Sequence, residues 1–145
     1  MESIRVKKLD PKAILPAYGS AEAAGADLYA CLSEPVTIAP GETFFVPTGL
    51  SLEVPKGCAG LIYARSSLGA KRGLAPANKV GVIDSDYRGE IRVVLLNHSK
   101  QEQTIAPGER IAQMIITPVI TPAYVEAEEL SDTCRGTGGF GSTGK

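Results

Sequence analysis

Apolar residues in this chain occur in short runs that are rich in Val, Ile, Thr and aromatic residues. Ten prolines and sixteen glycines punctuate the chain and leave little room for long helices. β-Branched and aromatic residues bounded by turn residues are typical of strands. Several runs alternate poorly between apolar and polar positions, which favours burial on both faces, in a sandwich or an oligomer core. We therefore predict strands within residues 4–9, 27–32, 43–54, 59–64, 90–97, 110–120 and 123–130.

Turn and helix signals complete an all-β pattern. The hexapeptide TIAPGE occurs at 37–42 and again at 104–109. Pro followed by Gly suits the two central positions of a type II turn, so we predict two similar hairpin starts rather than a repeat array. The stretch SSLGAKRG, 66–73, predicts one short helix with a serine as N-cap and Gly73 as its stop. No linker divides the chain, so residues 1–134 are predicted to form one all-β core domain before a loose glycine-rich tail.

Composition limits the classes of function. The chain has 145 residues, of which 43% are hydrophobic and 21% charged, enough for one globular core without a metal or disulfide scaffold. Its net charge of −1 and pI of about 5.9 argue against a nucleic-acid coat or a membrane-surface protein, so we expect no direct nucleic-acid binding and no membrane. A small anionic ligand remains compatible with local basic clusters.

The cysteines and the N-terminus point to a reducing compartment. Cys31, Cys58 and Cys134 are far apart and form no CxxC pattern, which predicts reduced thiols rather than a zinc site. The first residues, MESIRVKKLD, lack the apolar stretch of a signal peptide, and no apolar run approaches the length of a membrane span. We expect a cytoplasmic protein, with a nuclear or organellar location as the alternative in a eukaryotic cell, and a processed transit peptide also stays open.

The histidine content narrows the possible chemistry. His98 is the only histidine and lies beside a predicted turn, where we interpret it as a surface loop residue. This interpretation excludes most nucleophilic hydrolases and histidine-rich metal sites. Carboxylates, magnesium and arginines remain as the chemical tools.

Polar residues at predicted strand ends are the candidates for that chemistry. Arg65, with Ser66 and Ser67, ends one strand and could bind phosphate; the alternative is a capped helix with an exposed arginine. Asp84 directly follows the apolar run VGVI, where a carboxylate could polarise a water; the alternative is an ordinary hairpin loop.

Two further polar residues lie within predicted strands. Asp27 follows Gly25 at a strand start, and its alternative interpretation is a turn aspartate. Gln113 lies in an otherwise apolar strand, where a buried amide must bond to backbone or face a site.

The combination of these segments is more specific than any one of them. AGADLYA (24–30), RSSLG (65–69), GVIDSDYRGEI (81–91), PGERIAQMI (107–115) and RGTGGFGSTG (135–144) follow one another in this order. With these five motifs, the chain closely resembles the trimeric dUTPase family. The one departure is Ser67, where many members have glycine, and a serine there only adds a donor.

The resemblance implies a fold, an assembly and a reaction. The expected fold is a jelly-roll-like β-sandwich or barrel with one short helix, assembled into a homotrimer whose sites are each built from three chains. The expected reaction is the Mg²⁺-dependent hydrolysis of dUTP to dUMP and pyrophosphate by attack of water on the α-phosphorus. That reaction limits uracil incorporation into DNA and supplies dUMP for dTMP synthesis. By resemblance, Asp84 orients and deprotonates the water, and Asp27 holds Mg²⁺ through a metal-bound water.

The resemblance also implies how the substrate is bound. Tyr87 matches the aromatic residue that packs on the deoxyribose, and Phe140 the ring that stacks on uracil. The tail, 135–145, is expected to close over the substrate as a flexible lid because glycines let it approach closely. The remaining matches are phosphate contacts at Arg65, Ser66, Ser67 and Gln113, tail contacts at Arg135, Gly141, Ser142 and Thr143, and uracil recognition at Asn78, Gly81, Val82 and Ile83.

Two other functions are compatible with parts of this pattern. A dCTP deaminase shares the fold and an RSS segment, but has no counterpart to the GGFGSTG tail. A non-catalytic nucleotide-binding regulator of the same fold is the other alternative. Intact Asp27, Asp84 and Arg135 argue against the loss of catalysis.

Overall fold

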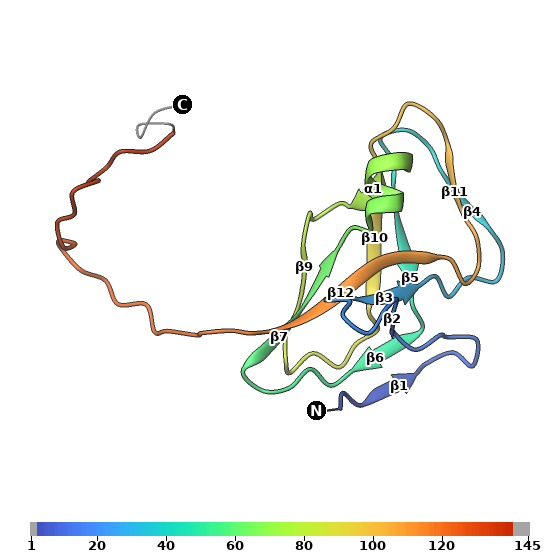
Figure 1. Cartoon of the computed structure of the whole chain (residues 1–145), viewed down its shortest axis with the longest axis horizontal. Helices are drawn as coiled ribbons and strands as arrows, with labels where there is room; N and C mark the ends of the chain where they lie inside the picture. The colour runs from blue at the N-terminus through green and yellow to red at the C-terminus, as the bar shows by residue number, and fades with distance from the viewer. Residues whose placement is uncertain (1–2, 141–145) are drawn as a thin grey trace.

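Antiparallel strands make up nearly all of the regular structure of this chain (Figure 1). The structure, a computed structural model, describes residues 3–140 and has twelve strands and one helix within them. The helix is α1 (Ser66–Arg72), and the strands are β1 (Val6–Lys8), β2 (Ala17–Tyr18), β3 (Ala26–Tyr29), β4 (Val36–Ile38), β5 (Thr43–Pro47), β6 (Leu50–Leu52), β7 (Cys58–Tyr63), β8 (Leu74–Pro76), β9 (Gly81–Ile83), β10 (Arg92–Asn97), β11 (Gln103–Ile105) and β12 (Arg110–Pro118).

The strands form two main sheets and two smaller pairs. The larger sheet has the order β2-β3-β12-β7-β9, and the smaller has the order β5-β10-β8. The pairs are β1 with β6 and β4 with β11, and every pairing is antiparallel. Leu28 and Met114 of the larger sheet belong to the same buried cluster as Val46 and Leu95 of the smaller one. The predicted jelly-roll-like all-β fold with one short helix is therefore confirmed.

Six of the seven predicted runs contain strands. The run 43–54 divides into β5 and β6, because the chain turns at Gly49, whose φ is +66°. A Cβ at Gly49 would lie 2.9 Å from the side chains of Ala13 and Cys31, so only glycine fits this turn.

The prediction of a strand at 123–130 is wrong for the single chain. These residues are exposed and form no strand. Residue type alone suggested a strand, but a strand also needs a neighbour to satisfy its backbone N–H and C=O groups. No strand of the described chain lies beside this segment.

Both TIAPGE turns are confirmed as type II, but the predicted hairpins are wrong, because β4 does not pair with β5 and β11 does not pair with β12. Gly41 and Gly108 have φ values of +78° and +74°, and each turn is closed by a backbone hydrogen bond three residues apart. The two copies also pair with each other, which the sequence analysis did not foresee. Thr37 of β4 lies opposite Thr104 of β11, with their hydroxyl oxygens 2.9 Å apart.

Helix α1 ends as predicted but begins differently. Gly73 adopts a left-handed conformation, with φ of 66°, and its N–H bonds to the carbonyl of Leu68. The predicted serine cap is wrong, because Arg65 takes the N-cap position and no side chain caps the helix. Both serines lie in the first turn instead.

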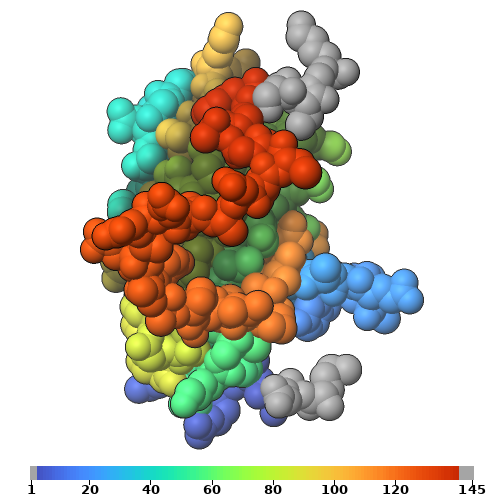
Figure 2. All heavy atoms as spheres, turned by 90° about the vertical axis from the view of Figure 1, so that its left-hand side faces the viewer, coloured from blue at the N-terminus to red at the C-terminus, as the bar shows by residue number. Residues whose placement is uncertain are grey.

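The chain leaves the body of the molecule after β12. In Figure 1, residues 119–140 run away from the sheets, and from the left-hand side of that view they lie between the viewer and the body (Figure 2). Val119 still donates a backbone hydrogen bond of 2.9 Å to Gly57. Beyond it the segment exposes the large apolar side chains of Ile120, Tyr124, Val125, Leu130 and Phe140.

Candidate active site

Asp27 is the centre of a charged cluster on the larger sheet. This β3 residue is only 7% exposed. Its Oδ1 accepts a hydrogen bond of 2.7 Å from Nε of Arg65, and its Oδ2 accepts one of 3.3 Å from Nη1 of Arg110. Burying a carboxylate is costly unless it is paired and hydrogen-bonded, and both of its oxygens are. The cluster is thus a carboxylate held between two cations.

A β-bulge brings Arg110 to this cluster. Gln113 lies directly opposite Asp27, so the two share one face of the sheet. Arg110 is three residues from Gln113, and regular alternation would turn its side chain to the other face. The register shifts between Arg110 and Ala112, which places Arg110 opposite Tyr29 and on the same face as Asp27. The second arginine of the site therefore depends on one extra residue in β12.

Gln113 both bonds to the backbone and faces the cavity. Its Nε2 donates to the carbonyl of Ala64 at 3.0 Å. Its Oε1 is turned toward Gly25, where an added Cβ would lie only 2.7 Å away. Any side chain at position 25 would displace the amide, so this glycine is required by close approach. The two alternatives from the sequence turn out to be compatible.

The cluster lines a polar cavity of about 200 Å³. Two arginines, one glutamine and Ser66 line it beside the single carboxylate of Asp27, so its excess of positive charge is suited to an anion. Ser67 does not line the cavity, and it accepts a hydrogen bond of 3.2 Å from Nη1 of Arg65 instead. The cavity is lined by Gly19, Ala23, Gly25, Asp27, Arg65, Ser66, Arg110 and Gln113.

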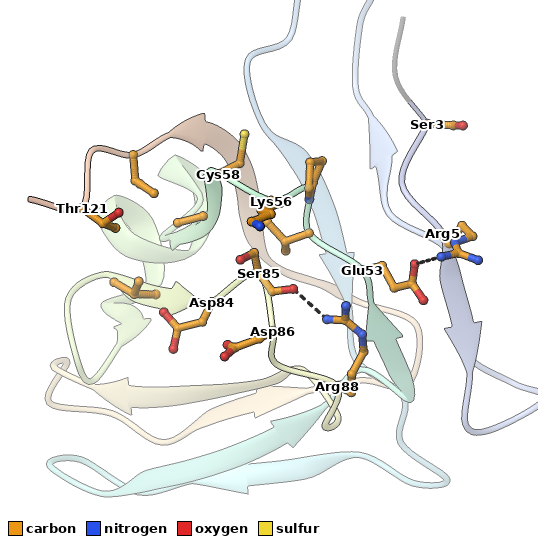
Figure 3. Close-up of a pocket in the computed structure, with 15 residues that line it drawn as sticks. Ser3, Arg5, Glu53, Lys56, Cys58, Asp84, Ser85, Asp86, Arg88 and Thr121 are labelled. Carbon is orange, nitrogen blue, oxygen red and sulfur yellow. Dashed lines mark hydrogen bonds and ion pairs between the residues drawn. The ribbon is translucent and has the colours of Figure 1, made fainter.

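Asp84 lies in a different cavity. It is exposed and follows the end of β9, as the sequence predicted, and it lines a wide groove with Asp86 and Arg88 (Figure 3). The loop that carries it is tied down at two points. Ser51 donates from its hydroxyl to the carbonyl of Arg88 at 2.7 Å, and Nη1 of Arg88 donates to the carbonyl of Ser85 at 2.8 Å.

The register of the sheet separates the two carboxylates. Gln113, opposite Asp27, pairs with Tyr63 at the end of β7, whereas Ile83 of β9 pairs with Gly60. Asp84 is therefore offset from Asp27 by four residues along the strands and by three strand spacings, or about 20 Å. A single chain does not bring the two residues to one ligand.

The predicted uracil and sugar contacts surround β9. Val82 is 60% exposed and faces the groove of Asp84, while Ile83 lines a separate hollow with Tyr87. Tyr87 is 43% exposed, and its hydroxyl donates to the carbonyl of Glu90 at 3.0 Å. Asn78 lies exposed in the preceding turn, and its Nδ2 would be 3.6 Å from a Cβ at the buried Gly81.

The predicted tail contacts are only partly within the described residues. Arg135 bonds within its own turn, from Nε to the carbonyl of Gly138 at 2.8 Å, and Phe140 is fully exposed. Gly141, Ser142 and Thr143 lie outside residues 3–140. His98 is exposed, as predicted, and the three cysteines are free thiols.

The described residues contain neither a metal-binding cluster nor a membrane-spanning helix. Within residues 3–140 no group of three His, Cys, Asp or Glu side chains is placed to hold a metal ion. No helix in this range is long and apolar enough to cross a membrane.

Arg110 is the residue of this cluster that the sequence analysis missed. Its partner, Asp27, lies 83 positions earlier in the chain, and the alternation of β12 assigns it to the wrong face. The motif PGERIAQMI contains Arg110, but its contact with Asp27 depends on the bulge, which is visible only in the structure. No signal in a single sequence marks that bulge.

Comparison with known proteins gives a consistent picture. The dUTPase family model matches residues 11–144. The deoxyuridine 5'-triphosphate nucleotidohydrolase of Nautilia profundicola is 51% identical, with 98% of this chain and 99% of that protein covered. The protein of the same name from Janthinobacterium sp. (strain Marseille) is 49% identical, with 100% and 99% covered.

Solved structures agree with these sequence relatives. A variant dUTPase of Staphylococcus bacteriophage 80alpha, solved with dUpNHpp, superposes with a TM-score of 0.88 at 28% identity, and both chains are covered completely. The fold of a dUTPase from phage phi11 of S. aureus, solved with a structural Mg(II) ion, is also similar, with a TM-score of 0.81 at 24% identity over 90% of this chain and all of that one. Sequence, fold and the order of the motifs agree, and this chain belongs to the dUTPase family.

Proposed function

We propose that this protein hydrolyses dUTP to dUMP and pyrophosphate, and so limits uracil incorporation into DNA and supplies dUMP for dTMP synthesis. One observation carries the proposal. Asp27, Arg65, Arg110 and Gln113, from three separate motifs, converge on one anion-suited cavity. They do so in a chain that is 51% identical over nearly its whole length to a named nucleotidohydrolase.

The chemical step assigned to Asp84 is a proton transfer. The carboxylate accepts a proton from a water molecule as the water oxygen forms a bond to the α-phosphorus. The bond from that phosphorus to the oxygen bridging to the β-phosphorus breaks, and pyrophosphate leaves with the electron pair. The position of Asp84 supports this role, because an exposed carboxylate at the end of β9 is accessible to water and substrate.

The residues present fit a magnesium ion that arrives with the substrate. No three-ligand cage exists within residues 3–140, and both oxygens of Asp27 already bond to arginines. A carboxylate with two oxygens retains lone pairs for further donors, including a metal-bound water. Mg²⁺ keeps several waters and is usually bound through one or two carboxylates plus substrate phosphates. Bound in this way, Mg²⁺ would neutralise charge on the phosphate chain.

A trimer with shared sites explains the separation of the motifs. The offset of about 20 Å between Asp27 and Asp84 means that one ligand reaches both only if they come from different chains. The residues 119–140 could span on the order of 70 Å when extended, enough to reach a neighbouring chain. Their exposed apolar side chains support packing on a partner. We therefore propose that three chains build each site.

Recognition of the nucleoside is assigned to residues around β9 and to the tail. Tyr87 packs on the deoxyribose and leaves no space for a 2′-hydroxyl, and Phe140 stacks on uracil. Residues 135–145 act as the lid that closes over the phosphates. The uracil edge is read by Asn78, Gly81, Val82 and Ile83, and the lid binds phosphate through Arg135, Gly141, Ser142 and Thr143.

The cytoplasm is the compartment we propose for this activity. All three cysteines are free thiols in the structure. Disulfides are rare in reducing compartments, so free thiols fit such a location.

The proposal is tested by assaying pyrophosphate and ammonia separately with dUTP and with dCTP, with and without Mg²⁺. We expect pyrophosphate from dUTP and no ammonia from dCTP. Ammonia release would indicate a deaminase, and nucleotide binding without turnover would indicate a non-catalytic regulator.

The role of Asp84 has its own test. Asp84→Asn should lower kcat by roughly 10²- to 10⁴-fold while nucleotide binding persists, because a positioned base is lost. Asp86→Asn is the matched control, since Asp86 lines the same groove two positions later. If Asp86→Asn lowered kcat more than Asp84→Asn did, the assignment of Asp84 as the base would be wrong.

A further inference from the structure

Arg72, at the last turn of α1, makes an unusually complete set of contacts with the segment 103–109. Its Nη1 forms an ion pair with Oε1 of Glu109. Its Nε donates to Oε1 of Gln103 at 3.1 Å, and its Nη2 donates to the carbonyl of Thr104 at 2.5 Å. The planar guanidinium thus binds three acceptors at once, which a lysine cannot reproduce.

Glu109 is fixed from the other side as well. Its Oε2 accepts a hydrogen bond of 2.9 Å from the backbone N–H of Ala106, within the type II turn before β12. The pair is half-buried, with side chains 30% and 24% exposed for Arg72 and Glu109. Partial burial and several shared hydrogen bonds distinguish it from a solvent-exposed ion pair, which contributes little.

These contacts close a ring of connected residues, three of which line the anion-suited cavity. The ring runs from Asp27 to Arg65, along α1 to Arg72, across to Glu109, and through the adjacent Arg110 back to Asp27. The seven residues of α1 span about 10 Å. Arg65 and Arg110 are therefore linked to each other through α1, Arg72 and Glu109.

The connection meets β12 next to the bulge. Arg110 is the first residue of β12 and is separated from the regular part of the ladder by the register shift at Ile111. An extra residue disrupts the ladder locally, and the chain before it is held by backbone hydrogen bonds of 2.8 Å between Ala30 and both Gly108 and Glu109. The side chain of Glu109, paired with Arg72, ties the same segment to α1 as well.

We propose that Arg72 and Glu109 are positioning residues for the phosphate-binding cavity. They hold the C-terminal end of α1 against the start of β12 and so set the positions of Arg65 and Arg110 on either side of Asp27. Neither residue touches the cavity, and both act through their neighbours. This role rests on the proposed function, because it concerns binding of the triphosphate of dUTP.

A positioning role has a consequence that general structural support lacks. The cavity is assigned to the phosphate chain, whereas the nucleoside is assigned to β9 and the tail. Loosening the ring should weaken binding of a triphosphate and leave binding of a monophosphate nearly unchanged. Loss of folded protein would weaken both equally.

The experiment uses Arg72→Gln, Glu109→Gln, the double variant and Arg72→Lys in the full-length chain. Binding of dUpNHpp and of dUMP is measured by calorimetry, and kcat and KM are measured with dUTP. The controls are Lys71→Gln and Glu102→Gln, which remove exposed charges one residue from Arg72 and seven residues from Glu109.

We expect each single variant to lower kcat about 10- to 100-fold, since a small misplacement of a binding group has effects of this size. Affinity for dUpNHpp should fall while affinity for dUMP stays near that of the wild type. The double variant should lose no more than the worse single variant, because both break one connection. Arg72→Lys should recover part of the rate by keeping the ion pair alone.

Two results overturn the proposal. One is kinetics in the Arg72 and Glu109 variants equal to those of the two controls. The other is a parallel loss of dUMP and dUpNHpp binding, which would show a merely structural role. Failure of the wild type to hydrolyse dUTP would instead contradict the proposed function, and the positioning role would fall with it. Wild-type hydrolysis with unaffected variants would overturn the positioning role alone.

Discussion

The single chain stabilises the Asp27 cluster well and the segment 119–140 hardly at all. Around Asp27, both carboxylate oxygens are hydrogen-bonded and Gln113 is held by Ala64, so the side chains are oriented before any ligand binds. In the segment 119–140, large apolar side chains are exposed, and Ile120 and Tyr124 are 92% and 97% accessible.

The difference fits the proposed trimer, in which another chain completes the site. The Asp27 cluster is complete within one subunit. Apolar side chains as exposed as Tyr124 gain stability only by packing on something else. The Asp84 loop lies between these extremes, because it is held by Ser51 and Arg88 but lies about 20 Å from the phosphate cavity. A preorganised half-site and an unpartnered segment together indicate a site completed by assembly.

Removal of the tail should have the largest effect on activity. Deletion of residues 135–145 should lower kcat/KM on the order of 10²-fold or more, because the proposed lid contacts to the phosphates are lost. The thermal unfolding midpoint should change little, since Arg135 and its neighbours bond only within their own turn in the described chain. Steady-state kinetics and circular dichroism melts measure the two effects.

A second truncation serves as the control for assembly. Deletion from residue 119 onward should also dissociate the proposed trimer, which sedimentation would detect. Normal kinetics in the shorter truncation would show that the tail takes no part in turnover.

The preorganised cluster can be broken at Gly25. An alanine there places its Cβ 2.7 Å from Oε1 and 3.1 Å from Cβ of Gln113, so the Gln113 side chain must shift, which disturbs its bond to Ala64. We expect a loss of about 1–3 kcal/mol in the free energy of unfolding, as is typical of overpacking. Gly19→Ala is the control, since Gly19 lines the same cavity and an added Cβ meets nothing within 4 Å. Urea denaturation compares the two, and equal stability would contradict the close-approach argument.

The smallest expected effect concerns Cys31 in the body. Partial burial, reinforced by the nearby carboxylates of Asp10 and Glu90, raises the pKa of the Cys31 thiol. Its folded-state pKa therefore exceeds the unfolded value, so its contribution to stability is complete below about pH 8.5 and is lost as pH rises through the folded value. We expect Cys31 to react with iodoacetamide more slowly than a free thiol at pH 8, and the gap to narrow at higher pH. A rate equal to that of glutathione across this range would contradict it.

Local chemistry in the sequence predicted the elements well. The stop of α1 at Gly73 and both Pro-Gly turns follow from backbone preferences that a single residue decides. The position of Asp84 after an apolar strand was likewise visible, because it depends on neighbours in the chain. The jelly-roll-like fold itself was predicted from the five motifs rather than from residue patterns.

Long-range register was not predictable in the same way. The bulge that turns Arg110 toward Asp27 and the pairing of the two TIAPGE copies depend on strands far apart in the sequence. The strand predicted at 123–130 was wrong because residue type does not reveal whether a partner strand exists. The offset of Asp84 from Asp27 follows only from the sheet order.

Subunit complementation tests the shared site most directly. Asp27→Asn and Asp84→Asn, each with strongly reduced activity, are unfolded, mixed in equal amounts and refolded together. If Asp27 and Asp84 of one site come from different chains, random assembly regenerates about a quarter of the native sites, and the mixture regains activity that neither variant has alone. If the mixture stays as inactive as the separate variants, both residues act within one chain, and the account of a site built between subunits is contradicted.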